Sequence, residues 1–217
     1  MSWSDVLHAV REGDLARLDD LLGRDPTLAE ARDAQGTPAL MHAIYRRRPD
    51  LAERLRAARN RLDASEAAAL GAAAELSARL REDAGAARAR TPDGFTPLHL
   101  AAYFGGAECA ALLLTHGADP EDVSRNAMAV RPLHSATSAG RSDVVALLLE
   151  SGVDVNARQQ ADITPLMQAA HAGNVPLVEQ LLARGADPSL PDASGKSAGD
   201  YAAGAGHAAL AARLAAR

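Results

Sequence analysis

The sequence is poor in cysteine and aromatic residues and has no long apolar run. Cys109 is the only cysteine among 217 residues, which excludes an intrachain disulfide and is typical of proteins that fold in a reducing compartment. Aromatic residues make up 3% of the chain, which suits small, closely packed helices better than a globular core. No run approaches the ~20 residues that span a membrane, and the first residues lack the pattern of an export signal. We therefore expect a cytoplasmic protein without a membrane segment.

The charge balance argues against one class of partner. The formal net charge is −5 and the isoelectric point is near 5.8, so no global attraction to nucleic acid is expected. Lys196 is the single lysine among 23 basic residues, and alanine is abundant. This bias indicates a GC-rich, bacterial coding sequence and carries no functional information.

Sequence signatures of common catalytic sites are missing as well. There is no G-x-S-x-G elbow, no phosphate-binding P-loop and no Cys/His cluster with the spacing of a metal site. Cys109 falls where a helix needs a small apolar residue and has no cationic neighbour within its helical turn, so we expect a buried, inert thiol. The sequence therefore predicts no catalytic residues, no cofactor and no metal.

What the sequence does contain is a pattern that is clearest in the segment 93–120. The turn dipeptide Asp93-Gly94 leads into Thr96-Pro97, where a hydroxyl group can cap a helix whose first residue needs no backbone N–H. A short alanine-rich helix is expected to follow. Gly105-Gly106 then interrupts the chain, and a leucine-rich second helix ends at Gly117. The unit is a helix–turn–helix preceded by a turn-rich arm.

This pattern recurs along the chain. With Gly105 as the reference, equivalent positions follow at intervals of about 33 residues, apart from one interval that is shorter by about ten. The equivalent positions are Gly13, Arg47, Gly71, Gly140, Gly173 and Gly206. The matching motifs are Thr96-Pro97-Leu98-His99-Leu100-Ala101-Ala102, Pro132-Leu133-His134-Ser135-Ala136 and Thr164-Pro165-Leu166-Met167-Gln168-Ala169-Ala170.

With these motifs at this period, the sequence resembles the ankyrin repeat family over essentially its full length. The resemblance implies an all-α solenoid of about seven helix–turn–helix repeats with turn-rich hairpin arms, in which the terminal repeats act as caps. No linker interrupts the phase, so we expect a single domain, residues 1–217. Its repeats are expected at about 2–30, 33–60, 61–90, 91–123, 126–158, 159–191 and 192–217.

The short interval between Arg47 and Gly71 predicts a missing arm. Asp63-Ala64-Ser65-Glu66 has the spacing of a capping box and follows the preceding helix within a few residues. The residues that are lacking correspond in number to one turn-rich arm. We therefore expect a gap in the row of arms between the second and third repeats.

The histidines and arm aspartates invite a chemical interpretation, which their spacing opposes. His99 and His134 occupy the same motif position in consecutive layers, and packed helices lie roughly 8–10 Å apart, whereas a shared zinc needs both nitrogens about 2 Å away. In the resembled family this histidine binds backbone groups of neighbouring arms. Asp119, Asp154 and Asp187 also recur once per layer, so we expect solvated turn residues rather than a catalytic pair.

A basic run extends from Arg46 to Arg61 in an otherwise acidic chain. It consists of Arg46, Arg47, Arg48, Arg54, Arg56, Arg59 and Arg61. One interpretation is a solvated helix face in an arginine-rich protein. The other is a local patch that attracts an acidic partner through paired carboxylate contacts.

Candidate binding residues follow from the resemblance. In the family, partners contact the arm tips and the two residues before the glycine that ends each inner helix. By this correspondence the candidates are Tyr45, Arg46, Leu70, Phe95, Tyr103, Phe104, Met128, Ser138 and His171. Phe95, Tyr103 and Phe104 cluster at one repeat, which resembles a binding hot spot. The alternative is that these rings pack against neighbouring arms.

The resemblance thus implies a non-enzymatic protein-interaction module that binds its partner in the concave groove formed by inner helices and arm tips. An acidic patch on that partner would match the basic run. The alternative functions are a regulatory or inhibitory subunit of an enzyme or toxin, similar to an immunity protein, and a translocated bacterial effector. We expect no nucleic acid or membrane partner and a monomeric chain, with self-association through the groove as the alternative.

Overall fold

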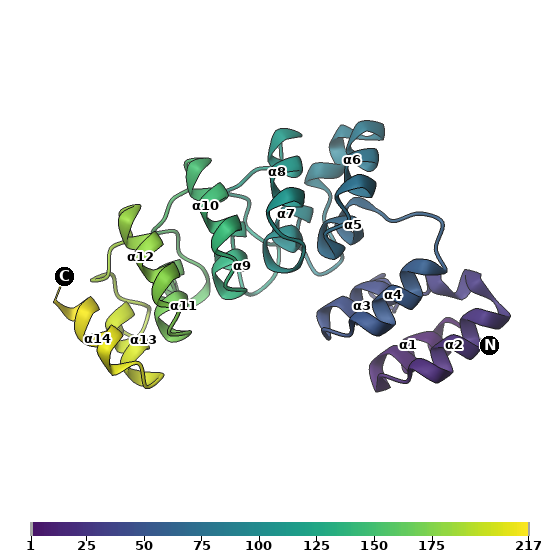
Figure 1. Cartoon of the computed structure of the whole chain (residues 1–217), viewed down its shortest axis with the longest axis horizontal. Helices are drawn as coiled ribbons and strands as arrows, with labels where there is room; N and C mark the ends of the chain where they lie inside the picture. Colours follow the sequence, from purple (N-terminus) through teal and green to yellow (C-terminus); the bar gives the residue numbers. More distant parts are fainter. Residues whose placement is uncertain (1, 217) are drawn as a thin grey trace.

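The computed structural model describes residues 2–216. This part of the chain forms fourteen α-helices and no β-strand, only an isolated backbone bridge between Arg32 and Pro38. The helices are α1 Trp3–Glu12, α2 Leu15–Arg24, α3 Ala39–Tyr45, α4 Pro49–Ala57, α5 Ala64–Leu70, α6 Ala73–Glu82, α7 Pro97–Leu100, α8 Ala107–Thr115, α9 Pro132–Ser138, α10 Ser142–Glu150, α11 Pro165–His171, α12 Val175–Ala183, α13 Ala198–Gly204 and α14 Ala208–Ala215. They stack in consecutive pairs along one axis, as expected of a solenoid (Figure 1).

Small residues on the inner helices allow the layers to pack closely. The inner helices are the odd-numbered ones. In each repeat an alanine lies four residues before the position that is glycine in every repeat but the second, and all seven alanines are completely buried. These residues are Ala9, Ala43, Ala67, Ala101, Ala136, Ala169 and Ala202. On the even-numbered outer helices, leucines such as Leu55, Leu113, Leu148 and Leu181 are fully buried and fill the space between layers. The result is one apolar core that runs the length of the stack.

The inner helices begin at the caps that the sequence predicts. The Thr164 hydroxyl accepts a hydrogen bond from the Met167 N–H at 3.3 Å, and Pro165 is the first helical residue. At α5 the Asp63 carboxylate accepts from the Glu66 N–H at 2.8 Å, and Glu66 accepts in return from the Asp63 N–H at 2.9 Å. The predicted capping box is therefore confirmed.

The ends of the inner helices differ at one repeat. In the other six repeats, the residue equivalent to Gly105 has a positive φ, and this holds even for Arg47, whose φ is 53°. In the fourth repeat α7 continues as a π-turn, η3 (Ala101–Gly105), and the positive φ moves to Gly106. Gly105 is required there because a Cβ atom would lie 1.8 Å from the backbone oxygen of Ala68 on α5. The two inner helices thus pack in backbone contact.

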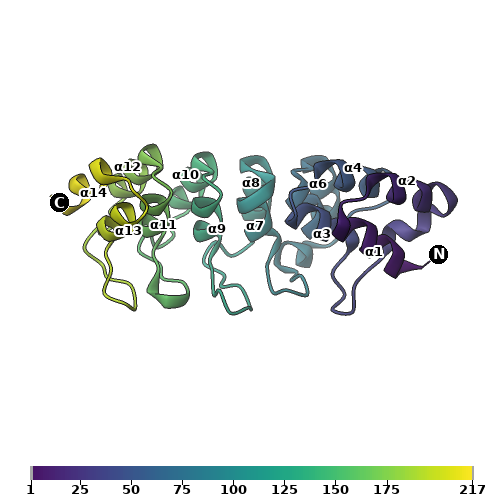
Figure 2. The ribbon, with the colours of Figure 1, turned by 90° about the horizontal axis from the view of Figure 1, so that it is seen from below.

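Five arms project from the same side of the stack, and one is absent (Figure 2). The arms are closed by backbone hydrogen bonds from Asp33 to Thr37, Thr91 to Phe95, Ser124 to Val130, Gln159 to Ile163 and Asp192 to Lys196. Between α4 and α5 the chain instead passes directly through residues 58–63, called the connector below. The predicted gap between the second and third repeats is confirmed. Figure 1 shows α1–α4 turned at this point relative to the row that begins at α5.

None of the helices between residues 2 and 216 combines the length and the apolar character that crossing a bilayer requires.

Candidate functional site

A cavity of about 540 Å³ opens between the inner helices and the arms of the second, fourth, fifth and sixth repeats. Its volume lies in the range of pockets that hold a bound group. Four of the six aromatic residues of the chain line it, namely Tyr45, Phe95, Tyr103 and Phe104. We call it the aromatic cavity.

The aromatic side chains form a connected wall across the third repeat. The rings of Tyr103 and Phe104 have centroids 4.6 Å apart, and Phe104 lies 5.9 Å from Tyr45. Arg47 stands over the Tyr103 ring at 5.7 Å from its centroid and donates a hydrogen bond to its hydroxyl at 3.2 Å. Residues of the second repeat therefore contact residues of the fourth, past the inner helix of the third.

Two features of the third repeat permit this contact. Its inner helix α5 carries Ala69 and Leu70 where the fourth repeat carries Tyr103 and Phe104, so no large ring intervenes. The third repeat also lacks its arm, and the N-terminal helices are turned at the connector. The cavity is thus a consequence of the same deletion that shortens the repeat.

Residues of this cavity carry three of the five buried side-chain polar atoms that, within residues 2–216, make no hydrogen bond of ordinary geometry. These are the Tyr45 hydroxyl, the Asp93 Oδ1 atom and the Gln168 Oε1 atom, and the Tyr45 hydroxyl lies beside the Asp93 carboxylate. Burial raises the pKa of the Tyr45 hydroxyl above its usual range, and the neighbouring Asp93 carboxylate raises it further. A buried polar atom without a partner costs about 1–3 kcal/mol, and such atoms cluster where function requires them.

The two motif histidines form part of the cavity floor and are held by backbone groups. His99 Nε2 donates to the Val130 carbonyl at 3.0 Å, and its Nδ1 accepts from the Thr96 N–H at 3.3 Å. His134 makes the corresponding bonds, with Nε2 at 3.1 Å from the Ala157 carbonyl oxygen. Burial lowers the pKa of His99 and lowers that of His134 to about 4. Backbone groups of the neighbouring arms thus hold both rings, and the predicted structural role is confirmed.

The predicted binding residues divide into two groups. Tyr45, Phe95, Tyr103, Phe104, Met128 and Ser138 line the aromatic cavity. The other three do not. Arg46 is exposed and reaches only the Arg11 carbonyl at 3.5 Å, and Leu70 is half-buried against the core. His171 is exposed at the end of α11, 6.2 Å from the Tyr201 ring.

Cys109 is fully buried on α8. Burial raises the pKa of its thiol to about 11, and the carboxylates of Glu108 and Glu75 act in the same direction. The thiolate is therefore disfavoured at neutral pH, and the predicted burial of this thiol is confirmed.

Most of the basic run is occupied in ion pairs. Arg48 pairs with Asp50 at 2.8 Å and Arg54 with Asp19 at 2.6 Å, while Arg56 pairs with Glu75. Within residues 2–216, only Arg46 and Arg47 of the run have no carboxylate partner. The run is thus a largely exposed face whose charges are mostly paired, and its unpaired charge is confined to these two residues.

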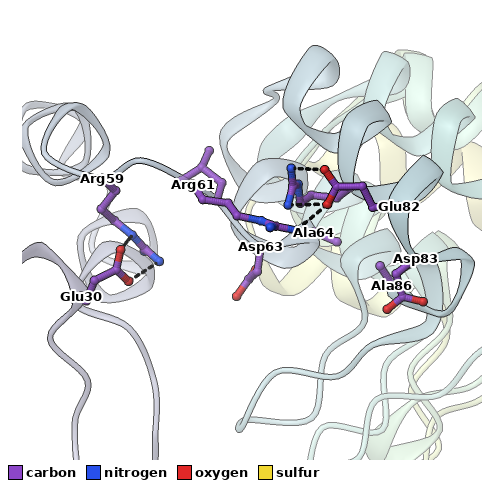
Figure 3. Close-up of a pocket in the computed structure, with 10 residues that line it drawn as sticks. Glu30, Arg59, Arg61, Asp63, Ala64, Glu82, Asp83 and Ala86 are labelled. Atoms are coloured by element: carbon purple, nitrogen blue, oxygen red, sulfur yellow. Dashed lines mark hydrogen bonds and ion pairs between the residues drawn. The ribbon is translucent and has the colours of Figure 1, made fainter.

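The remaining two arginines of the run hold the connector (Figure 3). The Arg59 side chain is 4% exposed and joins Glu30, which follows α2, to the fully buried Glu66 of α5. Arg61 pairs with Glu82 at the surface, where Arg79 also reaches Glu82 at 2.7 Å. A second cavity, of about 380 Å³, lies between these side chains. Charged groups therefore occupy the place where an arm is lacking.

Asp93, Arg47 and Gln168 are among the cavity residues that sequence reasoning did not place at the binding site. Asp93 was expected only as a turn residue, and Arg47 only as the end of an inner helix and a member of the basic run. One signal was present, since Arg47 is the single departure from glycine at that position. Nothing in the sequence indicates that a residue of the sixth repeat, Gln168, would lie near residues of the second.

Comparisons with known families agree with this architecture. Models described as ankyrin repeats in three copies and in many copies match residues 64–159 and 148–202, respectively. The chain belongs to the ankyrin repeat family. No curated protein matches it significantly. The matched region begins at α5, the first helix after the connector, and the helix pairs α1–α2 and α3–α4 lie before it.

The family assignment sets the general function. Ankyrin repeats mediate protein–protein interactions and are typically non-catalytic, and the matched region, residues 64–202, corresponds to no catalytic domain. A particular partner does not follow from membership.

Proposed function

We propose that this chain is a non-catalytic protein-binding domain of seven repeats whose partner docks in the concave groove at the aromatic cavity. The observation that carries the proposal is the aromatic wall of Tyr45, Tyr103 and Phe104, half-buried and open to a cavity of about 540 Å³. Aromatic side chains at the centre of a concave surface dominate the affinity of many interfaces. A rigid stack of repeats also limits the entropy lost on binding.

The charge around the groove supports an acidic surface on the partner next to this site. Arg46 and Arg47 are exposed and have no carboxylate partner among residues 2–216. Unpaired surface charge of one sign accelerates association with an oppositely charged partner and favours its correct orientation. The remainder of the basic run is neutralised and contributes little to this attraction.

The test is capture of a partner from extracts of cells that produce the protein. The immobilised wild-type chain is compared with a variant carrying Tyr103→Ala and Phe104→Ala and with a Trp3→Ala control. Trp3 is 50% exposed and does not line the cavity. The control should retain a partner that binds in the groove, and the double variant should weaken its binding by at least ~1–2 kcal/mol, roughly tenfold. Far-ultraviolet circular dichroism checks that helicity is unchanged.

Equal capture by all three chains would exclude the aromatic cavity as the docking site. The identity of the captured protein decides between a general scaffold and an inhibitory subunit, because a stoichiometric enzyme or toxin would favour the latter. We also propose that the free chain is a monomer, which light scattering tests directly.

A further inference from the structure

The aromatic cavity contains one carboxylate that has no cationic partner among residues 2–216. Asp93 is the only acidic residue among the described residues that line the cavity, and its carboxylate lies beside the Tyr45 hydroxyl. An apolar occupant would leave this carboxylate without a countercharge. The occupant that fits best therefore carries N–H donors.

The side chains that line the cavity determine which kind of group can carry those N–H donors. Tyr45, Phe95 and Phe104 present ring surfaces, and Leu100 and Ile163 add apolar area. A cation is attracted to the faces of such rings, and a long aliphatic stem packs against them. Together with the Asp93 carboxylate, these walls suit a positively charged group on an apolar stem.

The rim of the cavity has the opposite sign. Arg47 lies over the outer ring of Tyr103, and neither it nor the adjacent Arg46 has a carboxylate partner among the described residues. A basic group that entered alone would be repelled by this rim. An acidic residue next to it in the same segment would pair with Arg47 and remove the repulsion.

Resting on the proposed function, we infer that the aromatic cavity receives an arginine side chain from an extended segment of the partner, flanked in that segment by an acidic residue. Arginine is favoured over lysine because its planar guanidinium both stacks on aromatic rings and offers several donors in fixed directions. Tryptophan or tyrosine would supply one donor and leave the Asp93 carboxylate without a countercharge.

The experiment uses a library of random dodecapeptides displayed on phage as the probe. The library is selected against the full wild-type chain, and enriched peptides are synthesised and titrated by calorimetry. Each is also titrated into Asp93→Asn, which removes the charge while keeping the side-chain shape, and into Asp143→Asn. Asp143 is exposed on the outer helix α10, so this control loses the same charge away from the groove.

The inference predicts peptides with one essential arginine and a neighbouring aspartate or glutamate. Their affinity should fall at least tenfold with Asp93→Asn or when the arginine is replaced by neutral citrulline, and less than twofold with Asp143→Asn. Arg47→Ala should weaken binding only of peptides that retain the acidic residue.

Two results would overturn the inference, and they differ in what else they imply. Peptides that lose affinity with Tyr103→Ala and Phe104→Ala but need no basic residue would exclude arginine and leave the proposed groove site intact. If every enriched peptide bound independently of both Asp93 and the Tyr103–Phe104 pair, the inference would fail and the groove site would lose its support as well.

Discussion

The junction at the connector and the junctions that follow it are held together in different ways. From the fourth repeat onward, neighbouring arms share backbone hydrogen bonds, beside ion pairs such as that of Arg90 with Asp122. Arg125 N–H donates to the Gly94 carbonyl at 2.9 Å in one pair of arms, and Gln160 N–H donates to the Met128 carbonyl at 3.1 Å in the next. At the connector no arm is present, and Arg59 links Glu30 to Glu66 instead. Charged side chains replace backbone hydrogen bonds where the arm is missing.

This difference has a geometric consequence for function. Regular arms keep each layer in register with the next, whereas the connector lets the N-terminal repeats turn toward the groove. That turn brings Tyr45 and Arg47 against the rings of the fourth repeat. An irregular junction in a regular array therefore brings residues from non-adjacent repeats together at the aromatic cavity.

Breaking the ion pair between Arg59 and Glu66 should lower the free energy of unfolding more than any other change proposed below. Arg59→Ala leaves the fully buried Glu66 carboxylate without its cationic partner, and removal of one member of a buried pair costs about 3–5 kcal/mol. We expect urea denaturation to show a loss of this size. Arg61→Ala is the matched control, because Arg61 is 65% exposed and exposed pairs contribute about 0–1 kcal/mol.

Similar losses for the two variants would show that the buried pair has no special role at the connector. The double variant Arg59→Met with Glu66→Met removes both charges and keeps apolar side chains in their place. If the ion pair mainly specifies geometry, this variant should regain much of the stability.

The junctions that the arms hold together should be sensitive to acid. Burial lowers the pKa of His134 to about 4, so the folded chain binds its proton less tightly than the unfolded chain does. As the pH falls from 6.5 to 4, the unfolded state takes up protons first and the free energy of unfolding decreases. The full loss for this residue is about 3 kcal/mol. His99 acts in the same direction.

Urea denaturation of the wild type and His134→Gln between pH 7 and 4 measures this effect. We expect the variant to be less stable at pH 7 and to show a shallower pH dependence. Identical slopes for the two chains would contradict a neutral, buried His134.

The regular part of this fold could be predicted from the sequence because it is local. Thr164-Pro165 caps a helix by contacts within one turn, and the alanine at each layer interface is fixed by the repeat period. The missing arm was visible as a shortened interval. These features depend on neighbours in the chain or one repeat away, which the sequence displays directly.

The aromatic cavity could be predicted only in part. Tyr103 and Phe104 were identified by their position in the repeat, but the role of Asp93 depends on how far α1–α4 turn at the connector. The pairing of the basic run was within reach, since Arg54 and Asp19 are separated by 35 residues, about one repeat. Partners one layer apart can be found from spacing, whereas contacts between repeats two layers apart require the geometry of the turn.

Backbone contact between the third and fourth repeats should be sensitive to a single methyl group. The Cβ atom of Gly105→Ala would overlap the Ala68 carbonyl oxygen at 1.8 Å, so the layers must separate at a cost of about 1–3 kcal/mol. Gly204→Ala is the control, because no atom lies within 4 Å of its added Cβ. Thermal unfolding should show a lower midpoint for the first variant and an unchanged or higher one for the second. A tolerated Gly105→Ala would mean that the inner helices are less closely packed than described.

We expect the smallest change in the free energy of unfolding from a substitution of Tyr45, which the turned N-terminal repeats bring into the cavity. Tyr45→Phe removes a buried hydroxyl whose contacts with Asp93 and Thr91 lack ordinary hydrogen-bond geometry, while keeping the ring 5.9 Å from Phe104. Deleting an unsatisfied polar group should raise the free energy of unfolding by about 1 kcal/mol, whereas Tyr201→Phe, which breaks a 2.8 Å hydrogen bond to Asp192, should lower it by about as much. Urea denaturation of both variants decides the point. A loss of stability with Tyr45→Phe would show that the hydroxyl has a partner in the free chain, and that the cavity is less in need of an occupant than its unpaired atoms indicate.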